Sequence, residues 1–177
     1  SLGLLNPPEM SVSELFEPFS YGRGIASGYM NQDAWPDLAI ANKDRVRIYQ
    51  STGGKFQLTF ELGEFDLNSP ESFSPFVVAF SDLNNDGWSD LFVSLYGGQN
   101  RIYLNNNGHF DKQNYVVIYP PKSNLTMAVG FADPDKDGDV DIVLGSWSFG
   151  DLKHFQPVFS QNYFVENLTE KTKFIPT

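Results

Sequence analysis

Apolar residues in this chain occur in short runs separated by polar turns. Runs at residues 38–41, 91–95 and 142–145 are each followed by a turn and a second β-rich run, at residues 46–49, 101–104 and 163–165. Further runs lie at residues 58–62, 76–80 and 115–119, and Gly, Asn and Pro mark the turns between them. No stretch has a convincing helical period. Short runs bounded by turn residues predict β-strands throughout the chain.

An acidic loop precedes each run of the first set. Residues 82–90 and 133–141 share the pattern D-x-[ND]-x-D-G-x-x-D, and residues 29–37 form a weaker copy with Tyr29 and Ala34 in place of Asp and Gly. The closing aspartates, Asp37, Asp90 and Asp141, are 53 and 51 residues apart. A fixed period of about fifty residues is typical of a repeat architecture.

The repetition extends beyond the acidic loops. Phe56 and Phe110 each follow a turn after the second run, and Phe174 closes the third copy after a longer turn. Each repeat thus contains about four short strands, which is typical of the blades of an all-β propeller. We divide the chain into a degenerate first repeat at 21–70, a second at 71–122 and a third at 123–177. Residues 1–20 are interpreted as a leftover outer strand of a preceding blade, or a linker.

Composition narrows the classes of function. The net charge of −10 argues against nucleic acid and anionic membranes as partners, because both require a cationic face. No apolar run is long enough to span a membrane, and the chain has no cysteine for disulfide or thiolate chemistry. Neither His109 nor His154 lies in a triad-like pattern, and no phosphate-binding glycine loop or zinc-spaced histidine cluster is present. We therefore expect no enzymatic activity from this segment.

The two complete loops carry the residue types that bind a hard cation. Calcium takes about six to eight oxygen ligands from carboxylates, amides, carbonyls and water. In a tight loop, side chains at positions 1, 3 and 5 converge, glycine at position 6 permits the turn, and position 9 returns from the next strand. The predicted ligands are Asp82, Asn84, Asp86, Asp90 and the Trp88 carbonyl in the second loop, and Asp133, Asp135, Asp137, Asp141 and the Asp139 carbonyl in the third. We expect the first loop, with Asn31, Asp33 and Asp37, to be a weak or empty site.

Two other interpretations of these loops differ in strength. An EF-hand requires Glu at position 12, where this chain has Val93 and Leu144, and strands follow where a helix should, so that interpretation fails. The plainer alternative is that Asp, Asn and Gly serve only as turn residues. Two near-complete copies one period apart favour metal binding over turn formation alone.

The loops and the strands around them resemble a known family. The segments DLNNDGWSDLFVSLYGG and DPDKDGDVDIVLGSW, with NRIYLNNNGHF after the first and the YGRGIA opening of the first copy, resemble FG-GAP/VCBS repeats of integrin-α-like β-propellers, in the branch found beside ASPIC/UnbV segments. The resemblance implies calcium-loaded blades in a secreted or surface-exposed propeller of about seven blades. Three repeats fall short of such a ring, so we expect other blades or another chain to cover the exposed blade faces.

The leading hypothesis is a calcium-stabilised, non-enzymatic binding or adhesion scaffold with a protein or glycan ligand, in an extracellular, cell-surface or periplasmic location. The alternatives are a propeller-type carbohydrate-binding lectin and a non-catalytic propeller attached to an enzyme. Trp35 and Trp88 share one loop position, which indicates a repeated packing role between blades, with glycan stacking as the functional alternative. The insertion at residues 148–160 is the best place to look for specific recognition, and a tolerated loop with no such role is the plainer alternative. Asn124 and Asn167 begin N-x-T glycosylation triplets.

Overall fold

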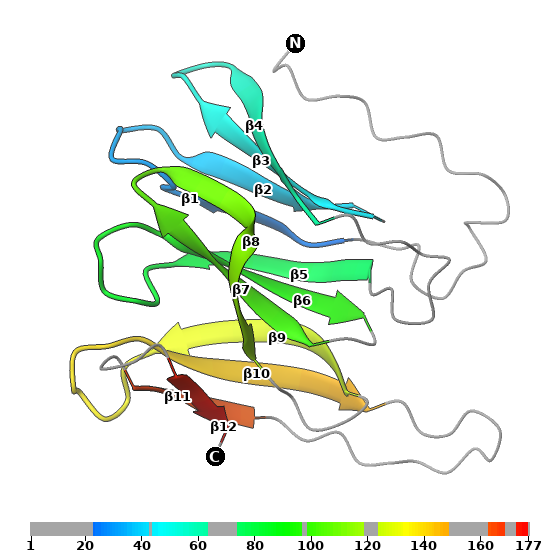
Figure 1. The fold of residues 1–177 in the computed structure, drawn as a ribbon, viewed down its shortest axis with the longest axis vertical. Helices are drawn as coiled ribbons and strands as arrows, with labels where there is room; N and C mark the ends of the chain where they lie inside the picture. Colours follow the sequence, from blue (N-terminus) through cyan, green and yellow to red (C-terminus); the bar gives the residue numbers. More distant parts are fainter. Residues whose placement is uncertain are drawn as a thin grey trace, which may run out of the picture.

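The computed structural model describes residues 23–42, 44–63, 74–96, 99–118, 124–148, 163–168 and 173–176. These residues form twelve β-strands in three four-stranded antiparallel sheets and contain no helix, hence none that could cross a membrane. Figure 1 shows the three sheets following one another along the molecule. The all-β prediction and the four strands per repeat are confirmed. The interpretations of residues 1–20 and of 149–160 lie outside the described residues.

Each sheet is an up-and-down meander whose strands are hydrogen-bonded in chain order. Blade 1 consists of β1 (Ile25–Gly28), β2 (Asp37–Ala41), β3 (Val46–Ser51) and β4 (Phe56–Leu62). Blade 2 consists of β5 (Ser74–Ser81), β6 (Asp90–Tyr96), β7 (Asn100–Asn106) and β8 (His109–Ile118). Blade 3 consists of β9 (Asn124–Ala132), β10 (Asp141–Ser148), β11 (Tyr163–Leu168) and β12 (Lys173–Pro176). The third blade keeps the common order in spite of the long connection between β10 and β11.

Two apolar clusters join the blades, and blade 2 contributes to both. On β6, Leu91 and Val93 belong to the cluster shared with blade 1, whereas Phe92 between them belongs to the cluster shared with blade 3. Side chains alternate between the two faces of a strand, so a strand buried on both faces reads as a continuous apolar run. Burial of each such side chain stabilises the folded chain by roughly 1.5–3 kcal/mol. Packing between blades therefore accounts for much of the core.

The first strands of successive blades lie side by side. β1 contacts β5, and β5 contacts β9. The backbone N–H of Gly24 donates to the carbonyl of Phe76 at 2.6 Å, which ties the start of blade 1 to blade 2. Small residues permit this approach, since a Cβ atom on Gly28 would lie 2.6 Å from the Cβ of Phe80. Sheets whose first strands adjoin in this way are arranged as blades of a β-propeller.

Candidate metal centre

The three acidic loops connect the first and second strands of their blades and lie on one side of the molecule, at the left of Figure 1. In the second loop, Asn85 and Gly87 have φ angles of 56° and 88°, and in the third loop Lys136 and Gly138 have φ angles of 62° and 100°. These left-handed residues turn the chain sharply, and glycine adopts such angles at no steric cost. The first loop has Gln32 and Ala34 at these positions, and neither has a positive φ. Its backbone therefore follows a different path.

Side-chain oxygens of the loops bind the backbone N–H groups that follow them. In the second loop, Asn84 Oδ1 accepts from the N–H of Asp86 at 3.1 Å and Asp86 Oδ1 accepts from the N–H of Trp88 at 2.9 Å. Asp82 Oδ2 accepts from the N–H of Gly87 at 2.9 Å. The corresponding bonds elsewhere are Gly138 N–H to Asp133 Oδ2 at 3.2 Å, Asp139 N–H to Asp137 Oδ1 at 3.1 Å, Asp33 N–H to Asn31 Oδ1 at 3.2 Å and Trp35 N–H to Asp33 Oδ1 at 2.7 Å. Turn formation by these residues is thus a real role in every copy.

Three carboxylates of the third loop also meet at the surface. One oxygen each from Asp133, Asp135 and Asp137 lies within 4.8 Å of the others, and all three residues are exposed. Hydrogen bonding to the carboxyl of Asp139 is the largest cause that raises the pKa of Asp137, and the charge of Asp135 adds to it. Oxygen atoms gathered in this way are a donor set for a hard cation such as calcium. In the second loop the middle member is Asn84, whose Nδ2 donates to Asp86 Oδ2 at 2.9 Å, so the repulsion there is smaller.

The closing aspartates have a structural role that the sequence pattern did not reveal. Asp37, Asp90 and Asp141 begin the second strand of each blade and are 0%, 0% and 1% exposed. In each, Oδ1 accepts at 2.8 Å from the backbone N–H of the residue at or near the end of the third strand, which is Ser51, Asn105 or Asn167. In the first two blades, Oδ2 accepts at 3.0 Å from the N–H of the second loop residue, Met30 or Leu83. Burial raises the pKa of Asp37, and it raises that of Asp90 to about 6.

Asp141 differs from the other closing aspartates at one atom. Its Oδ2 is buried and has no hydrogen-bond partner. The reason is chemical, because the loop residue that would donate, the counterpart of Met30 and Leu83, is Pro134, and proline has no backbone N–H. A buried carboxylate oxygen without a partner is costly. The third loop therefore combines the acidic cluster with a closing carboxylate that retains unused acceptor capacity, which fits the chemistry of a bound cation.

Asn105 and Asn167 are functional positions that sequence reasoning missed. Besides binding Asp90 through its backbone, Asn105 donates from Nδ2 to the carbonyls of Met30 at 2.6 Å and Ser89 at 2.9 Å. Asn167 donates from Nδ2 to the carbonyls of Leu83 at 2.7 Å and Val140 at 3.1 Å. The available signal was an asparagine recurring at the end of the third strand. Asn167 is 1% exposed and its Nδ2 donates across the blade interface, so this nitrogen is not accessible for glycosylation in the folded chain.

The two loop tryptophans pack on turns of their own blades. A Cβ atom on Gly53, in the turn between β3 and β4, would lie 2.8 Å from the ring of Trp35. A Cβ atom on Gly108, in the turn between β7 and β8, would lie 3.5 Å from the Trp88 ring and 3.5 Å from Asn31 of blade 1. The contact that recurs is therefore with a turn of the same blade, and the predicted packing role between blades stays a prediction.

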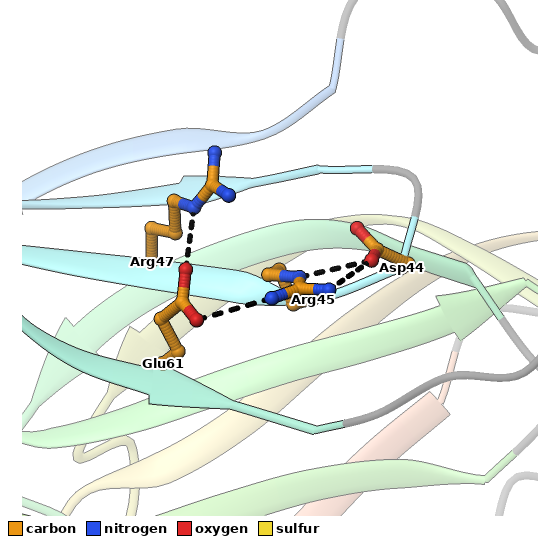
Figure 2. A network of polar contacts seen from close by, with 4 residues as sticks. All are labelled: Asp44, Arg45, Arg47 and Glu61. Carbon is orange, nitrogen blue, oxygen red and sulfur yellow. Dashed lines mark hydrogen bonds and ion pairs between the residues drawn. The ribbon is translucent and has the colours of Figure 1, made fainter. Parts of the chain in front are cut away.

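A second charged cluster, on blade 1, is neutralised internally. Figure 2 shows Glu61 between two arginines: Arg47 Nε donates to it at 2.7 Å and Arg45 Nη1 at 3.1 Å, while Arg45 also pairs with Asp44. Hydrogen bonds from Arg47 and Arg45 lower the pKa of Glu61, and the bond from Arg45 lowers that of Asp44. Carboxylates compensated in this way are a surface ion-pair network and are poor candidates for holding a cation.

Comparison with known proteins identifies the repeats. A family model described as FG-GAP-like repeat matches residues 30–93 and again residues 82–144, so each match runs from one acidic loop into the strand that follows the next. No curated protein matches the chain. Together the two matches cover more than half of the residues, including the second and third acidic loops in full. The chain belongs to the FG-GAP-like repeat family.

Proposed function

We propose that this chain is a calcium-stabilised segment of an extracellular β-propeller and serves as a non-enzymatic binding or adhesion scaffold. The observation that carries the calcium assignment is the third loop, where three carboxylates meet and the closing Asp141 keeps a buried oxygen without a donor. The sequence motifs of the chain support its assignment to the VCBS-type, ASPIC/UnbV-associated branch of the family. That assignment in turn supports a ring of about seven blades.

Calcium stabilises such a loop by removing repulsion among its carboxylates. One carboxylate oxygen from each of Asp133, Asp135 and Asp137 lies within 4.8 Å of the others, and their mutual repulsion favours an open loop when no cation is bound. Closing that loop around an ion fixes the hairpin between β9 and β10. Extracellular modules commonly bind calcium with dissociation constants of about 10⁻⁴–10⁻³ M, which the calcium outside a cell is sufficient to saturate.

The three loops differ in their fitness for the ion. The third loop has a cluster of three carboxylates and the unused Asp141 oxygen. The second loop has Asn84 in place of the middle acid, and both oxygens of Asp90 already accept from N–H groups. The first loop lacks an acid at position 1 and both left-handed turn residues. We therefore assign the highest affinity to the third loop, a lower one to the second and little or none to the first.

Thermal unfolding with calcium or with chelator tests the proposal. A ligand that binds only the folded chain at a hundred times its dissociation constant adds about 2.7 kcal/mol to the free energy of unfolding. We expect a clear rise in melting temperature with calcium, and a much smaller rise in Asp137→Ala. Asp111→Ala is the matched control, since Asp111 is an exposed acid on β8 whose side chain binds only the N–H of Gln113. A melting temperature that ignores excess calcium, or that responds equally in both variants, refutes the calcium assignment.

One observation favours a lectin as the second candidate. Tyr29 and Trp35, both in the first acidic loop, are 55% and 51% exposed. Exposed aromatic rings of this kind offer a flat apolar face beside polar loop atoms, which suits the stacking of a sugar ring. A glycan array distinguishes the candidates: carbohydrate binding that is lost in Trp35→Ala, with an unchanged melting temperature, would favour the lectin over the adhesion scaffold.

A further inference from the structure

The asparagines at the ends of the third strands link the closing aspartates of neighbouring blades. Asp37 accepts from the N–H of Met30, the carbonyl of Met30 accepts from the side chain of Asn105, and the N–H of Asn105 donates to Asp90. The pattern then repeats: Asp90 accepts from Leu83, Leu83 from Asn167, and Asn167 donates to Asp141. A continuous series of buried hydrogen bonds therefore crosses both blade interfaces. We refer to the asparagine side chain in each step as the latch.

Each latch donates to the backbone carbonyl of a buried loop residue in the preceding blade. Met30 and Leu83, which provide these carbonyls, are each 1% exposed. The counterpart in blade 3 is Pro134, which is exposed. Pro134 lacks the N–H that serves the closing aspartate, but its carbonyl is the group that corresponds to the latch acceptors of the other blades.

The outer face of blade 3, which is the face away from blade 2, presents small or apolar residues at positions that form blade interfaces in the other two blades. Two positions after the closing aspartate stand Ala39, Phe92 and Val143; the first two are 0% exposed at the interface with the following blade, and Val143 is 41% exposed. Gly28 lies against Phe80 of the next blade, and its counterpart on blade 3 is the small, exposed residue Ala132. At these positions the outer face of blade 3 therefore resembles the faces of blades 1 and 2 that pack against a following blade.

We propose that the outer face of blade 3 docks a further repeat of the same kind, which covers Val143 and places an asparagine from the end of its third strand on the carbonyl of Pro134. This inference rests on the proposed propeller architecture and not on calcium. It specifies the partner by chemistry: a four-stranded repeat with an apolar neighbour-facing side and asparagine at the position of Asn105 and Asn167.

The latch argues against a second copy of this chain as the partner. In a head-to-tail assembly, blade 1 of the second copy would approach blade 3 of the first. Its residue at the latch position is Ser51, whose N–H binds Asp37 as that of Asn105 binds Asp90. The serine hydroxyl is one bond from Cβ, whereas the amide nitrogen of asparagine is two bonds from it. Ser51 therefore falls short of a carbonyl that an asparagine side chain can reach.

The test adds one repeat to the whole chain. Residues 63–118, which are blade 2 with the segment before it, are joined after Thr177 in one form with Asn105 and in another with Asn105→Ala in the added copy only. Because the natural chain contains no cysteine, Val143→Cys gives a single thiol on the face in question. The rate of its reaction with a maleimide reports how often that face is uncovered.

We expect rapid labelling of the unextended chain, strong protection in the asparagine form, and about tenfold weaker protection in the alanine form, as for the loss of one buried hydrogen bond. Equal protection in both extended forms overturns the latch, and protection in neither overturns the docking face. Labelling of the unextended chain that slows as its concentration rises identifies a second copy as the partner and also overturns the proposal. Because each rate is measured with calcium and with chelator, failure of the calcium assignment leaves this result unaffected.

Discussion

Replacing Asn105 by alanine tests the latch inside the natural chain. The substitution removes the Nδ2 bonds to the carbonyls of Met30 at 2.6 Å and Ser89 at 2.9 Å, and the bond that Oδ1 accepts from the N–H of Gly108 at 2.8 Å. Each bond contributes about 0.5–1.5 kcal/mol, and a buried group left without its partner costs about 1–3 kcal/mol. Met30 is 1% exposed, so its carbonyl is the group most affected. We expect Asn105→Ala to lower the free energy of unfolding by about 2–4 kcal/mol.

Urea unfolding followed by circular dichroism measures this loss, and two further variants identify its cause. Asn106→Ala is the matched control, because Asn106 is the next residue, is exposed, and accepts only from the side chain of Asn107; we expect a change below about 0.5 kcal/mol. Asn105→Asp keeps the shape but replaces the donor by an oxygen that faces two carbonyls near Asp90. It should cost more than alanine at neutral pH and less in acid. If Asn105→Ala unfolds within about 0.5 kcal/mol of Asn106→Ala, the latch reasoning is wrong.

Three further predictions concern charge and the loops. In chelator, the carboxyl of Asp90 should titrate by NMR with a pKa of about 6. Because folding raises this pKa above its ordinary value, protonation of Asp90 stabilises the folded chain relative to the unfolded chain. This contribution to the free energy of unfolding is full in acid and is lost as the pH rises through about 6. Pro134→Ala supplies the missing N–H to Asp141, so it should raise metal-free stability by about 1 kcal/mol and weaken calcium binding in calorimetry; unchanged affinity would contradict this. Glu61→Gln should cost less than about 1 kcal/mol, and only above the lowered pKa of Glu61, so the difference from the parent chain should vanish in acid unfolding curves.

The fold could be predicted because strands that are buried on both faces have continuous apolar sequences, and because the acidic loops recur at a fixed spacing between them. Leu91 to Leu95 reads as a strand by itself, and its counterparts after Asp37 and Asp141 fix the register of the repeat. Phe174 was recognised at the close of the third copy, and it lies in β12, where it pairs with Asn167. A strong local pattern repeated at one spacing is sufficient to predict the strands and the three sheets of the described residues.

The candidate site was less predictable because its decisive contacts join residues far apart in the chain. Asn167 binds the carbonyl of Leu83 across 84 residues, and local spacing does not reveal such a pair. The metal pattern also treats position 9 as a ligand and nothing more, although Asp90 uses both oxygens to bind backbone N–H groups. Pro134 is visible in the sequence, but its effect on Asp141 can be inferred only from the structure, where the N–H at the equivalent position, that of Leu83, donates to Asp90.

One residue type thus serves two purposes in these loops, and the balance between them is set by a neighbour. A closing aspartate that accepts from two N–H groups, as Asp90 does, links the loop and the third strand of its blade through both oxygens. Asp141 accepts at Oδ1 only, so its blade lacks one of these bonds, and its Oδ2 is left for the proposed calcium ion. A buried anion lacking a donor is tolerated only if something else compensates it. If the third loop holds calcium as proposed, proline at the second loop position marks the repeat whose closing aspartate gains most from the ion, whereas a residue with an N–H at that position marks one whose closing aspartate is already satisfied.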